Sequence, residues 1–159
     1  MKQLPRTRVK GRRHRMHLDL THLEKAVSQL EGSLGYLKSD LARNDSGLRE
    51  QFRAAAIQAF EYTYELAVKM LRRQLEQIVA NPAELRAMAF MELVRTGAEA
   101  GLVEDVARYR LYREKRNITS HTYDEERAEE VLAVLEPFLA DVRYLLAELK
   151  KRNPADDAH

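Results

Sequence analysis

The stretch from about Leu48 to Val79 constrains the fold more than any other part of this sequence. Its apolar residues recur at helical spacing on two neighbouring faces, one of which includes Phe52 and Met70 and the other Phe60. A helix that is apolar over so wide an arc has to be covered from more than one side. We therefore expect a long helix at the centre of a helical bundle.

A second stretch, from about Asp124 to Lys151, carries a regular heptad pattern. Its apolar positions are spaced alternately by three and four residues, at Ala128, Val131, Leu135, Phe138, Val142, Leu145 and Leu149. Such spacing places all of them along one side of a helix. Pro137 falls inside this helix and is expected to bend it, because proline removes one backbone hydrogen bond.

Three shorter helices complete the predicted fold. The first of them is predicted by a single apolar stripe, which consists of Leu23, Val27, Leu30, Leu34, Leu37 and Leu41. A turn at residues 44–47 follows this helix. The others span about residues 83–99, between Asn81-Pro82 and a cap at Gly101, and about residues 103–115. Gly and Pro are scarce, with six and four copies. The prediction is an all-α, up-and-down bundle of about five helices.

Charge is distributed unevenly along the chain. Residues 1–17 hold seven Lys and Arg and no acidic residue, whereas residues 18–159 hold 20 basic and 25 acidic ones. We expect a basic disordered arm at 1–17, a helical domain at 18–151 and a frayed tail at 152–159. The arm has two interpretations. In the first, the basic arm binds RNA through the release of counterions; in the second, the arm is a non-native extension upstream of Met16.

The amino-acid composition also limits which metal sites and covalent cross-links this chain can form. The chain has no cysteine, so disulfides and thiolate metal sites are excluded, and the expected ordered region holds only His22 and His121 as imidazole ligands. We expect neither a metal nor a cofactor. No apolar run approaches the length needed to cross a bilayer, and the start of the chain lacks the apolar segment of a signal peptide. A cytoplasmic protein is the expectation.

The chemistry of the sequence is concentrated in the eight residues from Arg116 to Tyr123, which read Arg-Asn-Ile-Thr-Ser-His-Thr-Tyr. An imidazole moves protons near neutral pH, and a guanidinium binds a phosphate through paired hydrogen bonds. Together Arg116 and His121 indicate phosphodiester chemistry. The alternative is purely structural, with Arg116 at the end of one helix and His121 at the start of the next.

These residues carry a family resemblance. Arg116-Asn117, His121 and Tyr123 resemble the signature of HEPN domains, an all-helical family. The runs Phe60 to Ala67 and Asn117 to Glu130 resemble more narrowly the branch encoded beside a minimal nucleotidyltransferase. The likeness covers about residues 18–150. It implies a HEPN-like fold and either a ribonuclease toxin of a toxin–antitoxin pair or a nucleotidyltransferase substrate-binding protein.

Cleaving RNA without a metal requires a base, an acid and a cation beside the phosphate. One chain supplies one imidazole at the motif, so we expect a homodimer in which a twofold axis brings two copies of Arg116 and His121 into one cleft. The resemblance implies the same arrangement. His121 would transfer protons and Arg116 would clamp the phosphate, with Asn117 as an orienting hydrogen-bond partner.

Further residues are expected to support this site. The N-cap of the last helix could be Ser120, Thr122 or Asp124, and Thr122 with Glu125 fits a capping box. His121 is therefore expected at or just before a helix N-terminus, where the backbone N–H groups favour an anion. Two supporting residues on the long helix, Glu65 and Tyr64, are expected behind the motif. The alternative for Glu65 is an exposed intrahelical pair with Lys69.

Tyr123 has a separate expectation. By resemblance, the tyrosine two residues after the histidine accepts AMP from the partner nucleotidyltransferase, which silences the toxin. Added charge beside Arg116 would occupy the anion site and exclude RNA. The alternative is a half-buried aromatic residue at a helix start.

Three functions therefore stay open. The first is a metal-independent endoribonuclease toxin, active as a homodimer and restrained by a nucleotidyltransferase. The second is a non-catalytic subunit that binds a nucleotide or nucleic acid for that enzyme. The third is a structural helical dimer. The intact motif favours the first over the third but does not separate the first from the second, because binding and cleaving a phosphate use the same residue types.

Overall fold

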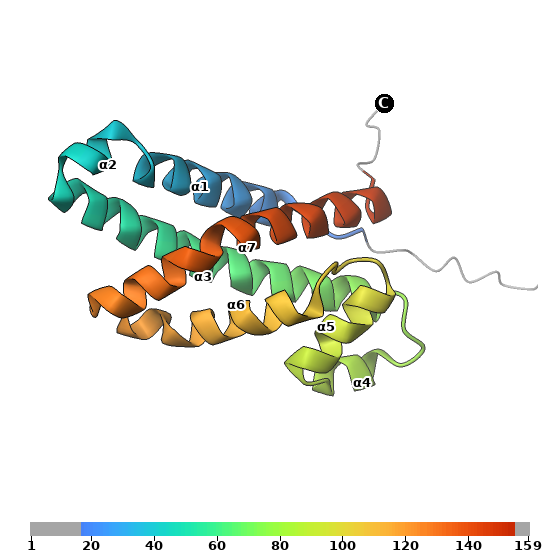
Figure 1. Ribbon diagram of the computed structural model, residues 1–159. Helices are drawn as coiled ribbons and strands as arrows, with labels where there is room; N and C mark the ends of the chain where they lie inside the picture. Colours follow the sequence, from blue (N-terminus) through green and yellow to red (C-terminus); the bar gives the residue numbers. More distant parts are fainter. Residues whose placement is uncertain (1–16, 155–159) are drawn as a thin grey trace, which may run out of the picture.

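The computed structural model describes residues 17–154. This range is folded into helices without a strand, and the long helices lie side by side in one bundle (Figure 1). The elements are α1 (Thr21–Leu37), α2 (Asp40–Asn44), α3 (Ser46–Glu76), α4 (Pro82–Ala87), α5 (Phe90–Glu99), α6 (Val106–Ile118), the 3₁₀ turn η1 (Thr119–His121) and α7 (Glu125–Arg152). The expected all-α bundle is confirmed.

Helix α3 is the central helix, as predicted. It begins at the N-cap Asp45, whose carboxylate accepts hydrogen bonds from the backbone N–H groups of Gly47 and Leu48. It packs against α1, α7 and every shorter helix. Phe60 at its centre is fully buried and meets Phe138 of α7 edge to face, at 4.8 Å between ring centroids.

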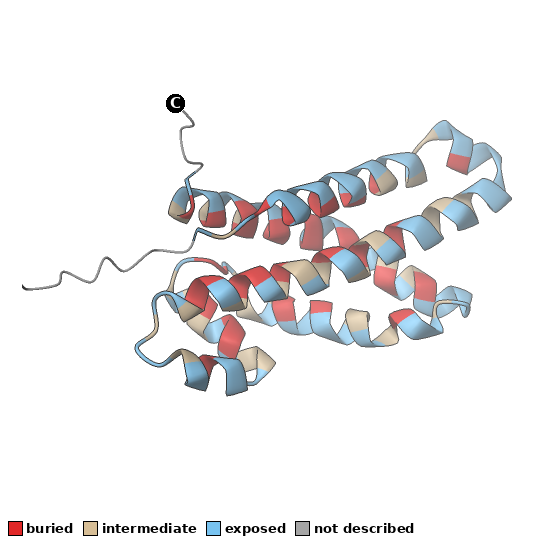
Figure 2. Cartoon of the chain, turned by 180° about the vertical axis from the view of Figure 1, so that it is seen from behind, coloured by how far each residue is buried: buried red, intermediate tan, exposed pale blue. Residues whose placement is uncertain are grey.

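Helix α7 closes the bundle with the side that the heptad pattern identified. All seven positions of the pattern are buried, and the helices in Figure 2 have buried residues on one side and exposed residues on the other. Pro137 lies inside α7 on its exposed side. The prediction of the heptad side is confirmed.

The end of the first helix was predicted wrongly. Helix α1 ends at Leu37, Ser39 has an extended backbone with ψ 162°, and a separate short helix α2 follows. The extended residue breaks the helical phase, so Leu41 leaves the apolar stripe and is 57% exposed.

The helix predicted over residues 83–99 is two helices. Met88 and Ala89 are extended and separate α4 from α5. No helix-breaking residue explains the interruption, but α4 is fixed independently: Leu85 is buried and its carbonyl accepts a hydrogen bond of 2.8 Å from Arg72 on α3. Contact with α3 therefore overrides local helix propensity. The predicted cap at Gly101 is confirmed by its φ of +78°.

A polar cluster fixes α6 on α7. Asp141 of α7 is 5% exposed and accepts two hydrogen bonds of 2.7 Å from Arg108, and the hydroxyl of the fully buried Tyr112 donates to the same carboxylate. Asp105 caps α6 and also accepts from Arg108. Because Tyr112 and Arg108 precede Arg116 on the same helix, this cluster sets how α6 presents the motif.

The two ends of the described chain are tied together. The backbone N–H of Leu18 donates to Asn153 Oδ1 at 2.9 Å, and Asn153, which is buried at the start of the predicted tail, donates to Gln74 Oε1 at 2.7 Å. The predicted basic arm and the rest of the tail fall on residues 1–16 and 155–159, outside the described residues. Among the helices of residues 17–154, none is both long and apolar enough to cross a membrane.

Candidate functional site

The motif is more helical than the sequence predicted. Arg116 and Asn117 belong to the last turn of α6, and His121 ends the 3₁₀ turn η1. A connection between two helices was expected at Arg116, but the helix continues to Ile118, and the N–H of Thr119 then bonds to the Arg116 carbonyl. Arg116 is therefore held by a rigid helix, whereas His121 lies in the tight turn that follows.

Arg116 points from α6 towards α3. Its Nη2 lies 2.5 Å from Glu65 Oε1, its Nη1 donates to Thr119 Oγ1 at 3.0 Å, and Glu61 Oε2 is 4.0 Å from Nη1. The Arg116 side chain is 29% exposed. The guanidinium is thus oriented from two elements while part of it remains open to a ligand.

Thr119 belongs to this site although the sequence analysis did not select it. It is 5% exposed, and its hydroxyl accepts from Arg116 Nη1 and donates to the Arg116 carbonyl at 2.8 Å. A threonine three residues after an arginine, at a helix end, was the available signal.

His121 and Tyr123 follow Thr119 in the chain and are both exposed on the surface. Their rings meet edge to face at 6.5 Å between centroids, and Tyr123 is 89% exposed. Within residues 17–154 the imidazole of His121 forms no hydrogen bond or ion pair. It is therefore available to a substrate. The alternative of a half-buried Tyr123 is wrong, because most of this side chain is exposed.

Two of the expected supporting residues are not engaged. Asn117 and Ser120 are exposed, and in the described part of the chain their side chains hydrogen-bond neither Arg116 nor His121. The N-cap of α7 is Asp124, whose carboxylate accepts from the N–H of Glu126. Thr122 instead donates to the Thr119 carbonyl, so the predicted capping box is wrong and His121 stands three residues before the cap.

Tyr64 of α3 lies close enough to Arg116 of the motif for the guanidinium charge to affect its pKa. Its half-buried ring lies between Phe60 and Phe90, at 6.1 Å from each ring centroid. Burial raises the pKa of Tyr64 to about 12, against the opposing effect of Arg113 and Arg116 nearby. Arg113 also stacks over Phe90 at 5.1 Å. The phenol is therefore a neutral packing group near Arg113 and Arg116 of α6.

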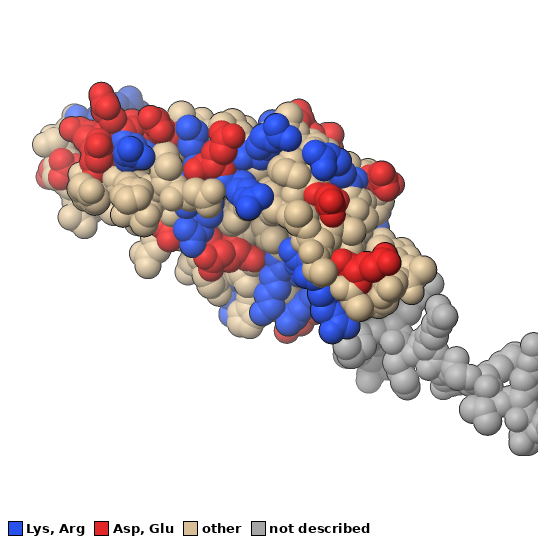
Figure 3. Space-filling model, turned by 90° about the horizontal axis from the view of Figure 1, so that it is seen from below, with Lys and Arg blue, Asp and Glu red and all other residues tan. Residues whose placement is uncertain are grey.

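A basic groove adjoins the motif on α3. It measures about 430 Å³, and its charged lining consists of three cations, Lys69, Arg72 and Arg73, and two carboxylates, Glu65 and Glu76. Seen from below, Asp and Glu cluster at one end, and over the rest of that face Lys and Arg are mixed with further Asp and Glu (Figure 3). Across residues 17–154, no group of three His, Asp or Glu side chains is placed to hold a metal ion.

Comparison with known proteins identifies the relatives of this chain. The profile of a family described as nucleotidyltransferase substrate binding protein like matches residues 18–151. The chain belongs to this family. The expected resemblance to the nucleotidyltransferase-associated branch is thereby confirmed.

Two relatives from Haemophilus influenzae are similar to this member of the nucleotidyltransferase substrate-binding family. One, named probable ribonuclease HepT, is 37% identical over 141 residues, which cover 87% of this chain and 97% of the relative. The other is a solved structure described as the fold of a substrate-binding domain of a nucleotidyltransferase. It is 36% identical with a TM-score of 0.80, and the match covers 83% of this chain and 99% of that one.

The two relatives agree in their similarity to this chain and differ in the function that their descriptions give. The helical fold matches the solved structure over nearly all of that chain. One name describes a ribonuclease and the other description a binding domain, so family membership alone leaves cleavage and binding both open.

Proposed function

We propose that this protein is a metal-independent endoribonuclease that works as a homodimer. The observation that supports it best is the side chain of Arg116, which Glu65 and Thr119 orient from two sides while 29% of it stays exposed. An exposed imidazole, that of His121, follows one turn later. A prepositioned cation beside a free proton-transfer group is what phosphodiester cleavage needs.

The reaction would be an attack of the ribose 2′-oxygen on the adjacent phosphorus. A base removes the 2′-hydroxyl proton, the new P–O bond forms a 2′,3′-cyclic phosphate, and the bond to the 5′-oxygen breaks as that oxygen takes up a proton. His121 would move these protons, and Arg116 would stabilise the charge that grows on the phosphate oxygens.

A second copy of the chain would complete this chemistry. One chain offers one motif imidazole, whereas the reaction uses a base and an acid. In a symmetric dimer each motif would gain the partner's His121 in the opposite role, because a twofold axis repeats every residue.

The basic groove beside the motif fits a nucleic acid strand. Lys69, Arg72 and Arg73 line it next to Glu65, the residue that holds Arg116. Such cations bind phosphates with release of counterions. A strand whose scissile phosphate lies at Arg116 would therefore continue along α3.

The regulatory partner in this proposal is the minimal nucleotidyltransferase of a toxin–antitoxin pair, in the cytoplasm. Tyr123 is 89% exposed beside His121, so its hydroxyl is accessible to an AMP-transferring enzyme. Transfer of AMP from ATP would form a tyrosyl phosphodiester and release pyrophosphate, and its charge would block the anion site. Intact mass measured with the partner enzyme and ATP tests this step; no gain in mass, or a gain that persists in Tyr123→Phe, would rule it out.

The central experiment compares two double variants in RNA cleavage with a chelator present. The combination of Arg116→Ala and His121→Ala should reduce the rate at least about a hundredfold. The combination of Arg127→Ala and His22→Ala removes an exposed arginine and an exposed histidine outside the motif, and should cleave like wild type. Equal rates for the two double variants would refute the proposal.

The second candidate is a non-catalytic binding subunit. The related structure described as a substrate-binding domain of a nucleotidyltransferase favours it. In that case wild type binds RNA or nucleotide, Arg116→Ala weakens the binding, and no RNA is cleaved by the wild-type chain. Growth arrest on expression without the partner, relieved by His121→Ala, would instead favour the nuclease.

A further inference from the structure

Arg113 lies one helical turn before Arg116 on α6 and has no part in the chemistry described above. Its guanidinium carbon lies 5.1 Å from the centre of the Phe90 ring, a cation–π contact between α6 and the start of α5. Phe90 is half-buried and packs against Tyr64, and Tyr64 packs in turn against the buried Phe60. The guanidinium is therefore held in place by a column of rings that begins in the core.

The charge of Arg113 is not neutralised by a carboxylate. Arg113 is exposed, and within residues 17–154 its side chain forms neither a hydrogen bond nor an ion pair. Lys115 of the same helix is paired, at 3.7 Å from Glu130. The contact with Phe90 fixes the Arg113 side chain without using its N–H donors, so all of them are available to a phosphate.

Arg116 by itself is an incomplete anion site. Two carboxylates, Glu65 and Glu61, lie 2.5 Å and 4.0 Å from its guanidinium nitrogen atoms. A phosphate beside Arg116 therefore meets two negative charges and one positive charge unless a further cation lies near. Burial raises the pKa of Tyr64 and the charges of Arg113 and Arg116 both oppose this rise, so the two guanidinium groups lie near the same ring. Arg113 supplies the further cation.

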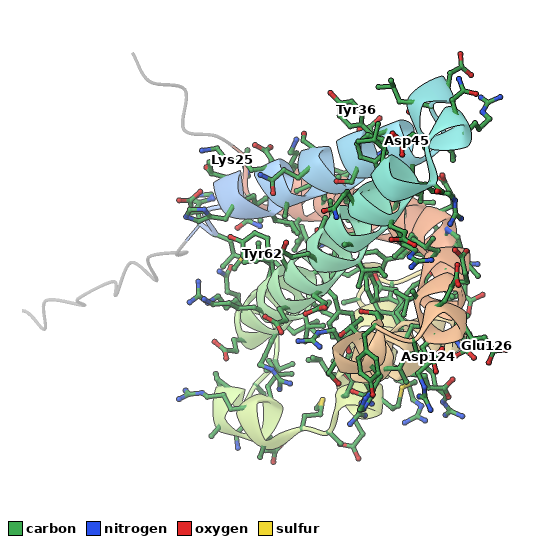
Figure 4. The ribbon with its side chains drawn as sticks, turned by 90° about the vertical axis from the view of Figure 1, so that its left-hand side faces the viewer. Lys25, Tyr36, Asp45, Tyr62, Asp124 and Glu126 are labelled. Carbon is green, nitrogen blue, oxygen red and sulfur yellow. The ribbon has the colours of Figure 1, made fainter. Side chains whose placement is uncertain are left out.

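The charges around the motif favour one direction for a bound strand. Figure 4 shows Asp124 and Glu126 at the start of α7, which follows the motif. An open hollow of about 780 Å³ is lined there by four carboxylates, Glu125, Glu126, Glu129 and Glu130. Like charges repel a phosphate backbone. Tyr64, by contrast, lines the groove on α3 in which cations outnumber carboxylates by three to two. A strand with one phosphate at Arg116 is therefore favoured to continue past Arg113 towards that groove.

We propose that Arg113 binds the phosphate next to the one at Arg116, so that the site takes a segment of single-stranded RNA with two consecutive phosphates. The two arginines are three positions apart on one helix, which puts their Cβ atoms about 5–6 Å apart. Two long side chains at that spacing reach neighbouring phosphates of one strand. The inference rests on the proposed function, because the phosphate at Arg116 is the scissile one in that proposal.

The salt dependence of binding counts the phosphates that the protein contacts. The probe is a short fluorescent oligouridine whose 2′-oxygens are methylated, so that it is not cleaved through these oxygens. Fluorescence anisotropy with the full chain gives Kd over a range of salt concentrations. In Arg113→Ala the slope of log K against log salt should become shallower by about 0.7, the contribution of one phosphate on a single strand. Kd at low salt should rise about tenfold.

Three further variants make the result specific. Arg95→Ala removes an exposed arginine of α5 and should leave the slope unchanged. Arg113→Lys keeps the charge and should keep the slope. The combination of Arg113→Ala with Arg116→Ala should reduce the slope by about 1.4, because two phosphate contacts are lost. An unchanged slope in Arg113→Ala would overturn the inference. A double variant that loses no more than Arg116→Ala would also overturn it, because the two arginines would then share one phosphate.

Two other ligands are distinguished by the same measurements. If Arg113→Ala weakens binding of oligoadenosine more than of oligouridine and keeps the wild-type slope, the guanidinium stacks on a base and the inference is wrong. ATP also carries consecutive phosphates. If ATP displaces the probe from wild type and loses affinity in Arg113→Ala to the same extent as the probe, the arginines bind a nucleoside triphosphate, and the assignment to RNA is wrong.

The outcomes also separate this inference from the nuclease proposal. A wild type that binds the probe with a slope dependent on Arg113 but leaves unmodified RNA intact would contradict the nuclease and support the second phosphate site. Cleavage of unmodified RNA together with an unchanged slope in Arg113→Ala would do the reverse. A wild type that does not bind the probe would overturn the second phosphate site.

Discussion

Arg116 and Glu65 lie 51 positions apart in the sequence and are joined by an ion pair of 2.5 Å between Nη2 and Oε1. The pair links the last turn of α6 to the central helix α3. Glu65 is 61% exposed, so the contact contributes little to stability. Its consequence is orientation, because a carboxylate on α3 fixes the direction of the guanidinium before any phosphate arrives.

This relationship predicts the effect of Glu65→Gln. The amide removes the charge partner while it keeps the shape, so RNA cleavage should fall roughly tenfold as Arg116 loses its orientation. The free energy of unfolding should change by less than about 1 kcal/mol. The control is Glu50→Gln, at an exposed position of the same helix. Faster cleavage by Glu65→Gln would show instead that Glu65 competes with the substrate for Arg116.

The raised pKa of Tyr64 predicts that the stability of the fold changes at high pH. Its pKa is raised by burial from about 10 in the unfolded chain to about 12 in the fold. The folded state therefore retains the phenolic proton at a pH where the unfolded state has lost it, and the free energy of unfolding should fall between about pH 10 and 12. Denaturation of wild type and Tyr64→Phe across this range checks it. The part of the decline due to Tyr64 should be absent in the variant, and identical pH profiles would contradict this assignment.

The substitution Arg108→Ala is expected to lower the free energy of unfolding. Arg108→Ala leaves the buried carboxylate of Asp141 without two hydrogen bonds of 2.7 Å. Because the Arg108 side chain is 42% exposed and Tyr112 still donates, we expect a loss of about 2 kcal/mol, below the roughly 3–5 kcal/mol of a fully buried pair. Urea denaturation measures it against Arg110→Ala, an exposed arginine of the same helix. Equal stability of the two variants would mean that the polar cluster does not hold α6.

Two glycines predict effects of opposite sign. Gly101 has a φ of +78°, and a Cβ there would lie 3.3 Å from Arg152 Nη2, so Gly101→Ala should destabilise the fold by about 1–2 kcal/mol. Gly35→Ala lies in an ordinary helix with open space around it, and should stabilise the monomeric chain by about 0.5–1 kcal/mol. Thermal denaturation of both variants, under conditions where the chain is monomeric, compares the signs. A destabilising Gly35→Ala would reveal a constraint on α1 that is internal to the chain.

Periodicity predicted the long helices because their burial is one-sided and regular. The heptad positions from Ala128 to Leu149 are all buried, and α3 is central. The errors fall where long-range contacts decide the backbone. Nothing in the residues around Met88 breaks a helix, and the break there accompanies the hydrogen bond from Arg72 to the Leu85 carbonyl.

The site was predictable in composition but not in geometry. The spacing of Arg116 and His121 marked the motif, and helical spacing put Glu65 and Lys69 on one stripe of α3. Whether Glu65 would pair with Lys69 or with Arg116 depended on where α6 crosses α3, which no local pattern encodes. Thr119 escaped notice because its role depends on a tight turn that extends the helix beyond the predicted end.

The hydrogen bonds that join Leu18, Asn153 and Gln74 also determine how this protein can be handled. Both ends of the described chain leave the bundle together, at the end opposite the turn that carries His121 (Figure 1). A fusion partner or a surface linker attached at residue 17 or at residue 154 would therefore sit away from the motif. Immobilised through either of these two positions, the molecule would present the face that carries His121 to the solution.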